Sequence, residues 1–155
     1  MTTVELDIEN KIVEYLQEEI TDIDIEAYNS DIISVYNKAK ECRNGLVVVS
    51  AENGSDPNVI SNNAVRGEPI YEIGVLAVVT ILTHDRRNRE GNAVFYNQIR
   101  DLLHTFTYNT YRGIFKYFEY KPIRLYDIEE GLWKSDIVIE FILNYPFDYL
   151  FEEET

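Results

Sequence analysis

The residues of this chain that are best suited to metal chemistry are its two histidines. His84 is followed by Asp85, so one segment could supply a nitrogen and an oxygen ligand to a divalent cation. A hydrolytic metal centre needs several protein ligands around one ion, and His104 is the only other histidine in the sequence. We therefore interpret His84 as a loop residue and His104 as a helix-surface or interface residue. A small metal-dependent hydrolase that uses His84, Asp85 and a further carboxylate stays open as an alternative of a different class.

The sequence also lacks the signatures of covalent catalysis and of phosphate binding. Cys42 is the only cysteine and lies in no catalytic signature, so the chain forms no internal disulfide and no zinc site of several cysteines. The sequence contains no Gly-x-Ser-x-Gly elbow and no Gly-Lys-Ser or Gly-Lys-Thr phosphate loop. Asp22, Asp24 and Glu26 alternate with apolar residues, which is typical of a strand with one solvated face rather than of a calcium loop. We predict no enzymatic activity, no cofactor and no bound metal.

The charge balance excludes one class of protein and singles out one segment. Lys and Arg number 14 against 28 for Asp and Glu, a net charge of −14, whereas a free-standing nucleic-acid binder needs a basic surface. Against this background Arg86, Arg87 and Arg89 lie within one polar loop, 84–92. The simpler alternative is a solvated loop, but we predict a contact with an acidic surface, such as the acid-rich N-terminal third of another copy. A contact between two different surfaces of identical subunits can close into a ring.

Tyrosine is the other unusual feature of the composition. The chain has 12 tyrosines, many of them in its C-terminal half. Tyrosine is enriched at protein–protein interfaces because its ring supplies apolar area and its hydroxyl a polar tip. We predict that Tyr117 and Tyr120, in a segment that reads as one strand of a hairpin, belong to a subunit interface formed at an exposed strand edge.

The elements that position these residues follow from hydrophobic periodicity. Apolar residues at steps of three or four predict helices over 8–20, 30–44 and 93–106. Alternation and β-branched runs predict strands over 22–27, 46–50, 70–83, 114–128 and 133–145. In 70–83 both alternating faces turn apolar in the middle, so part of this strand should be covered on both sides. The last two strands form a candidate antiparallel hairpin.

Local signals refine these boundaries. Ser30 is the expected N-cap of the second helix, and Gly45 should end it with a positive φ. Gly91 and Asn92 are the expected breaker and cap before the third helix. The expected apolar stripe of that helix comprises Val94, Ile99, Leu102, Leu103 and Phe106.

The chain has the length of one domain. We predict a single α+β domain over 1–150 and a mobile acidic tail over 151–155. The segment 52–69 is rich in Asn, Gly, Ser, Asp and Pro, which predicts either a long loop or an extended hairpin arm. The N-terminus lacks the pattern of a secretory signal, and the longest apolar run is too short to span a bilayer, so we expect a soluble protein.

The order of elements in the second half carries a resemblance to a known family. A long strand, Tyr71–Thr83, runs into the arginine-rich loop, then into the helix that contains Phe95-Tyr96-Asn97-Gln98-Ile99-Arg100-Asp101-Leu102-Leu103, and the last long strand is Trp133–Tyr145. This pattern resembles the tail-terminator (tail-completion) proteins of tailed bacteriophages, over residues from about 5 to 147.

The resemblance implies a small α+β subunit, with a mostly antiparallel sheet flanked by helices, that assembles into a ring, typically a hexamer. Such a ring caps the tail tube and offers a surface to the head-side connector proteins, with DNA only passing through the lumen. It implies a place in the neck or tail of the virion after assembly in the host cytoplasm. An acidic channel wall would repel DNA and prevent it from sticking.

Two further alternatives stay open beside the tail terminator. A head-completion or connector adaptor protein of the neck would share its fold and its structural role. A cytoplasmic binding module for a peptide strand or another protein would use the same exposed edges and arginines.

Overall fold

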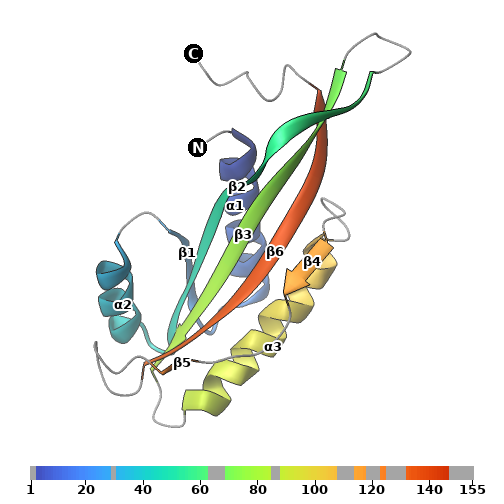
Figure 1. Cartoon of the computed structure of the whole chain (residues 1–155). Helices are drawn as coiled ribbons and strands as arrows, with labels where there is room; N and C mark the ends of the chain where they lie inside the picture. Colours follow the sequence, from blue (N-terminus) through green and yellow to red (C-terminus); the bar gives the residue numbers. More distant parts are fainter. Residues whose placement is uncertain are drawn as a thin grey trace.

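The structure, a computed structural model, describes residues 3–28, 31–62, 69–84, 88–107, 114–117, 123–124 and 132–146. The helices are α1 (Thr3–Glu19), α2 (Ile32–Glu41) and α3 (Asn88–Phe106). The strands are β1 (Asp24–Ala27), β2 (Gly45–Asn62), β3 (Pro69–Thr83), β4 (Ile114–Tyr117), β5 (Ile123–Arg124) and β6 (Trp133–Pro146). Helices lie against a mostly antiparallel sheet (Figure 1), which confirms the expected α+β class. The acidic tail expected over 151–155 lies outside the described residues.

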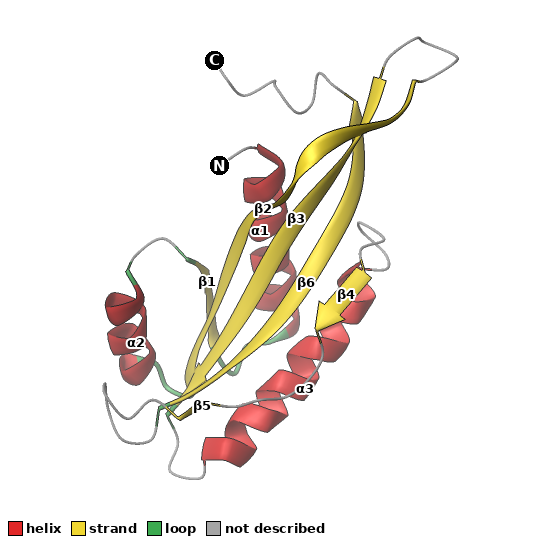
Figure 2. Ribbon diagram, viewed as in Figure 1, coloured by secondary structure: helices red, strands yellow, loops and turns green. Residues whose placement is uncertain are grey.

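Within the described residues, six strands form one sheet (Figure 2). The order is β1-β2-β3-β6-β4, and β5 also pairs with β6. β1 runs parallel to β2, and every other pairing is antiparallel. The short acidic strand β1 therefore lies at one edge of the sheet. The antiparallel pairing of β4 and β5 with β6 confirms the expected C-terminal pairing.

β2 and β3 continue beyond the helices as a long arm, and β6 pairs with β3 along it as far as Ile70–Pro146 (Figure 2). The two strands pair from Gly45–Thr83 to Asn62–Pro69, with shifts of register along the polar part of β2. Pro57 falls within one of these shifts, where its missing N–H interrupts no regular ladder. Of the two possibilities for 52–69, the described part forms the hairpin arm; residues 63–68 lie outside the described residues.

One face of the sheet is covered by α1 and α3 and holds the main hydrophobic core (Figure 1). Every second residue of the central strands is buried on this face: Val47, Val49, Ala51, Val75, Ala77, Val79, Ile81, Ile137, Ile139 and Phe141. The helices fill the core with Ile8, Ile12, Leu16, Tyr96, Ile99, Leu103 and Phe106. We call this side of the sheet the covered face.

The opposite side, which we call the open face, carries only the short helix α2 among the described elements. α2 packs Val35, Tyr36 and Ala39 on Leu46, Val48 and Leu82. β3 is thus covered on both sides at its Leu82 end, as its sequence predicted. The pattern of apolar residues on β3 extends further along the open face than α2 does.

The expected starts of all three helices are wrong. α1 begins at Thr3 rather than at residue 8. Asp31 caps α2 instead of Ser30: its carboxylate accepts hydrogen bonds from Ser34 N and Ser34 Oγ, both at 2.9 Å. α3 begins at Asn88, so the segment from Asn88 to Asn92 is helical rather than a polar loop. Asn92 does not cap the helix because its side chain bonds to the sheet.

The expected stripe of α3 is also wrong at one residue. Val94 is exposed, whereas Tyr96 is fully buried. Counting back from Ile99 by helical steps of three and four gives Tyr96 and then Asn92, and both are buried. The hydrophobic pattern of this helix therefore includes a polar residue, which a reading based on apolar residues alone passes over.

Gly45 has the expected positive φ but does not end the second helix, because α2 ends at Glu41 with Cys42 as its C-cap and Gly45 is the first residue of β2. Gly45 has a φ of 131°, a conformation that disfavours side chains. A Cβ at this position would lie 1.9 Å from the carbonyl oxygen of Leu82, so the close pairing of β2 with β3 also requires glycine here.

Candidate functional site

The residues predicted to form a subunit interface are only partly located. Arg86, Arg87 and Tyr120 lie outside the described residues. Arg89 lies in the first turn of α3 and Tyr117 at the end of β4, but their side chains are not described. The ends of the arginine segment are placed, because β3 ends and α3 begins at the end of the sheet remote from the arm (Figure 1). The interface role of these five residues stays a prediction.

His84 makes a local structural contact. Its Nε2 forms a hydrogen bond with the carbonyl oxygen of Cys42, and the ring is half-buried; Asp85 lies outside the described residues. Among the residues that the structure describes, no three His, Cys, Asp or Glu side chains gather in a group that could hold a metal ion. His104, on α3, is exposed, in line with its interpretation as a helix-surface residue.

Cys42 lies at the end of α2, close to the open face of β1. Burial, with Asp24 beside the thiol, raises its pKa to about 11. The thiol is therefore protonated at neutral pH, and a protonated thiol is a poor nucleophile. Asp24 and Glu26 share this face of β1, and Glu26 forms an ion pair with Lys38 of α2.

The open face of the central strands carries an apolar centre with an acidic rim. The strand register sets Glu52, Leu76 and Glu140 in one row across β2, β3 and β6. The next row comprises Ser50, Val78 and Val138. We call these six residues the open-face patch. Glu52 is exposed and the other five are half-buried, whereas their neighbours on the covered face are completely buried.

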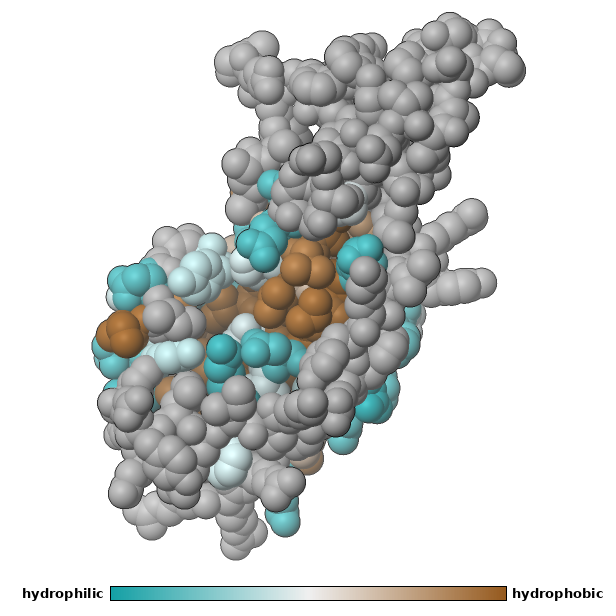
Figure 3. Space-filling view, viewed as in Figure 1, coloured by the Kyte–Doolittle hydropathy of each residue, from teal (hydrophilic) through white to brown (hydrophobic). Residues whose placement is uncertain are grey.

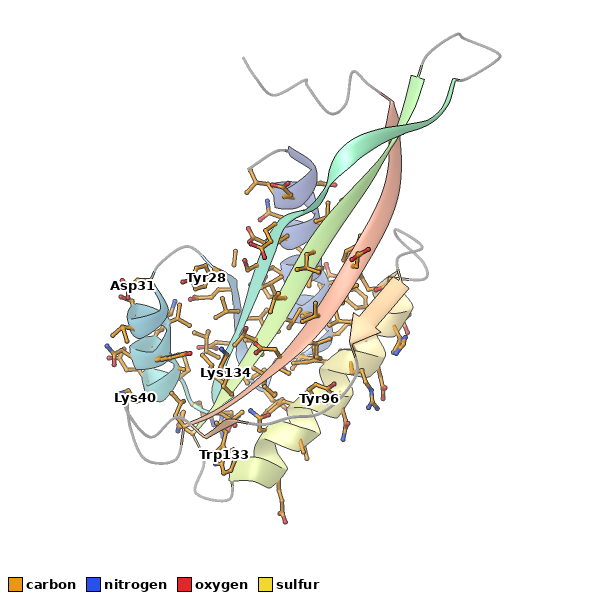
Figure 4. The ribbon with its side chains drawn as sticks, viewed as in Figure 1. Tyr28, Asp31, Lys40, Tyr96, Trp133 and Lys134 are labelled. Carbon is orange, nitrogen blue, oxygen red and sulfur yellow. The ribbon has the colours of Figure 1, made fainter. Side chains whose placement is uncertain are left out.

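Figure 3 shows this region as a hydrophobic surface at the centre of the sheet with hydrophilic residues around it. Between the patch and α2 lies a hollow of about 200 Å³, lined by Tyr28, Val35, Val48, Ser50, Val78 and Thr80. Tyr28 stands between α2 and the sheet (Figure 4) and is 38% exposed. Its backbone N–H donates to the carbonyl of Val49 at 2.9 Å, which fixes the wall of the hollow to β2.

Two side chains protect the edge of the sheet on the β1 side. Gln17 Nε2 donates to the carbonyl of Ile25 at 2.8 Å. Beyond Val49 no described strand continues the pairing of β1 with β2, and there the N–H of Ala51 donates to Glu9 Oε1 at 3.3 Å. Both contacts occupy backbone groups that an added strand would need, so this part of the edge is closed to strand addition.

Burial of the Glu9 carboxyl group disfavours its charged form. The side chain is 5% exposed. Burial raises its pKa, and the hydrogen bond from Ala51 offsets part of this rise. The burial of Glu9 could not be predicted, because a sequence pattern does not show that a strand edge needs an acceptor.

No protein-family model matches the chain, and no curated protein is similar to it in sequence. None of the described helices has the length and apolar composition that a membrane crossing requires. The open-face patch is thus the most distinctive surface of the described residues. Its one signal in the sequence is the apolar character of both faces of 70–83.

Proposed function

We propose that this chain is a structural subunit that assembles into a ring, as the tail-terminator proteins of tailed bacteriophages do. In this role it supplies shape and charge, and no reaction takes place. The ring caps the tail tube, stops its growth and presents a surface to the head-side connector. This function follows from the resemblance of the sequence pattern, and the geometry of the sheet supports it.

The observation that carries the proposal is the incomplete cover of the sheet. Leu76, Val78 and Val138 remain half-buried on the open face, although β3 is apolar on both sides. Apolar surface that a subunit leaves accessible and surrounds with polar residues is typical of protein–protein contacts. An assembly of several copies would remove this surface from water.

The net charge of −14 agrees with a ring through which DNA passes. An acidic wall repels the phosphates and keeps the duplex from binding as it moves. In the same acidic chain, the segment with Arg86, Arg87 and Arg89 supplies a concentrated positive charge for a contact between neighbours. Tyr117 and Tyr120 supply aromatic area to the same type of contact.

The test is the state of assembly of the full-length chain. Light scattering and electron microscopy are expected to show rings, and the rings are expected to bind the ends of tubes formed by the tail-tube protein of the same phage. A chain that stays monomeric at every concentration and does not bind these tubes would contradict the proposal. Labelling of intact particles then separates a tail terminator, on the tube end, from a head-completion protein, on the connector.

A further inference from the structure

We propose that the open-face patch is the acceptor surface for the arginine segment of a neighbouring copy of this chain. This inference rests on the proposed ring and adds the two surfaces that meet in it. The patch consists of Ser50, Glu52, Leu76, Val78, Val138 and Glu140. The segment comprises Arg86, Arg87 and Arg89, between the end of β3 and the first turn of α3.

The chemistry of the patch favours a cationic occupant with aliphatic stems. Glu52 and Glu140 lie on either side of Leu76 in one cross-strand row, so two carboxylates stand about an apolar centre. An arginine side chain can lay its methylene groups on Leu76 and Val78 while its guanidinium reaches a carboxylate. The hollow of about 200 Å³ beside Val78 offers space comparable to one large side chain.

Charge also disfavours the simplest alternative, in which two open faces pack on each other. Such a contact would bring the exposed Glu52 of both copies into one interface, and like charges across an interface oppose association. The arginine segment is instead the densest positive stretch of the sequence. Several described cations are already engaged locally: Lys11 with Asp7 at 3.3 Å, Lys38 with Glu26, and Arg100 with Asp101 at 3.2 Å.

The positions of the two surfaces fit a ring. The patch lies on the face of the sheet between α2 and the arm, whereas Thr83 and Asn88, which flank the arginine segment, lie at the opposite end of the strands (Figure 1). One copy thus presents its patch to one neighbour and its arginine segment to the other. Such a head-to-tail contact forms a closed ring when its rotation closes.

The first experiment reverses the charges of full-length chains and measures assembly by light scattering. Variant E52K/E140K and variant R86E/R87E/R89E, each alone, are expected to assemble with an apparent dissociation constant raised about tenfold or more. In an equal mixture, opposite charges meet again at both kinds of contact, so rings are expected to return. Variant E14K/E18K makes the same charge change at exposed positions of α1, within the acid-rich N-terminal third that is the alternative acceptor surface. It should assemble as the unmodified chain does, and a loss of assembly as large as that of E52K/E140K would contradict the inference.

The second experiment blocks the apolar centre. Variant V78N replaces apolar surface by an amide of similar size without changing the charge, and alone it is expected to assemble less tightly than the unmodified chain. Mixed with R86E/R87E/R89E, it is expected to form mainly dimers, because only the contact between the patch of the arginine variant and the arginine segment of V78N keeps its full strength. Circular dichroism checks that each variant is folded, and the exposed position of Glu52 keeps the first experiment valid if V78N does not fold.

The outcomes separate this inference from the proposed function. If the unmodified chain forms rings and E52K/E140K forms them equally well, or if the two charge variants do not assemble together, the inference is wrong and the ring proposal stands. If V78N assembles as tightly as the unmodified chain, another surface makes the contact and the inference is again wrong. If the unmodified chain never assembles and does not bind tail tubes, the proposed function itself fails.

Discussion

The two faces of the sheet differ in how far the helices bury the side chains of the same strands. Val79 points to the covered face and is completely buried beneath the helices. Val78, its neighbour in sequence, points to the open face and stays half-buried beside the hollow. The difference arises from the helices that cover each face: α1 and α3 span the covered face, whereas α2 reaches only the end near Leu82.

Polar groups differ between the faces in the same way. On the covered face, Asn92 Nδ2 donates to the carbonyl of Ile81 and to Thr83 Oγ1, both at 3.1 Å, and Ser135 Oγ donates to Asn92 Oδ1 at 2.6 Å. These buried groups satisfy one another. On the open face, the carboxylate of Asp136 accepts a bond from Thr80 at 2.7 Å and stays accessible to solvent. The covered face is closed, whereas polar groups of the open face stay accessible to solvent.

The difference between the two faces is tested most directly by placing the same charge on each face of β3. Val79→Asp is expected to unfold the subunit, with a loss of about 4 kcal/mol or more in the free energy of unfolding, because a carboxylate would be buried without a partner. Val78→Asp is expected to cost about 1 kcal/mol or less, because its side chain reaches solvent.

Urea unfolding followed by circular dichroism measures both values. The protein concentration should lie below that of assembly, since binding between copies adds apparent stability. Equal losses in the free energy of unfolding for Val78→Asp and Val79→Asp would show that both faces are equally buried, which would contradict the difference between them.

A smaller effect is expected from the polar network of the covered face. Asn92→Ala should lower the free energy of unfolding by about 2–3 kcal/mol, because Ser135 and the carbonyl of Ile81 lose a buried partner. Asn97→Ala, at an exposed position of the same helix, is the matched control and should stay within about 0.5 kcal/mol of the unmodified chain. Urea unfolding measures both, and a loss for Asn92→Ala no larger than the control's would count against the network.

The contact of Glu9 at the edge of the sheet predicts that the free energy of unfolding depends on pH. The pKa of Glu9 is higher in the folded chain than its ordinary value of 4.5. The protonated carboxyl therefore stabilises the fold fully when the pH is below 4.5. This contribution to the free energy of unfolding is lost as the pH rises through the pKa of the folded chain. Glu9→Gln keeps an acceptor for the N–H of Ala51 without the charge. The variant is therefore expected to be more stable than the unmodified chain at about pH 7, and the difference should vanish on acidification below the ordinary pKa.

Urea midpoints of the two chains across this pH range give the measurement for Glu9. Glu14→Gln, at an exposed position of the same helix, corrects for the change in surface charge. A gain for Glu9→Gln that is the same at every pH would show that burial of the charge is not its cause.

The smallest effect belongs to the ion pair between α2 and β1. Lys38 and Glu26 are largely solvated, with 53% and 31% of their side chains exposed. Lys38→Met is expected to cost less than about 0.5 kcal/mol, and the cost should shrink in high salt. Urea unfolding at two salt concentrations tests it. A large loss that is independent of salt would mean that α2 is held by this pair rather than by Val35, Tyr36 and Ala39.

Much of the fold could be predicted because its main elements have a regular period. The helical repeat of Ile8, Ile12 and Leu16, the alternation along 70–83 and the glycine at 45 each lead to the observed structure. The wrong predictions concern residues whose structure depends on tertiary contacts. Asn92 reads as a cap until the strands that its amide contacts are in place, and the polar stretch of β2 reads as a loop or an arm until β3 pairs with it.

The candidate site was less accessible to prediction. Arg86, Arg87, Arg89, Tyr117 and Tyr120 could be chosen from composition, but composition does not show which surface receives them. The open-face patch depends on the row Glu52–Leu76–Glu140, whose members are far apart in the sequence and meet only through the register of three strands.

By itself, the sequence determined the kinds of elements and the charge of the chain, because periodicity and composition are local properties that each segment carries wherever it lies. The tertiary structure decided which face of the sheet is closed and which edge groups are occupied. Which face is closed depends on how short α2 is compared with β3. Which edge groups are occupied depends on the side chain that reaches each backbone group. Such relations exist only after distant segments have packed together.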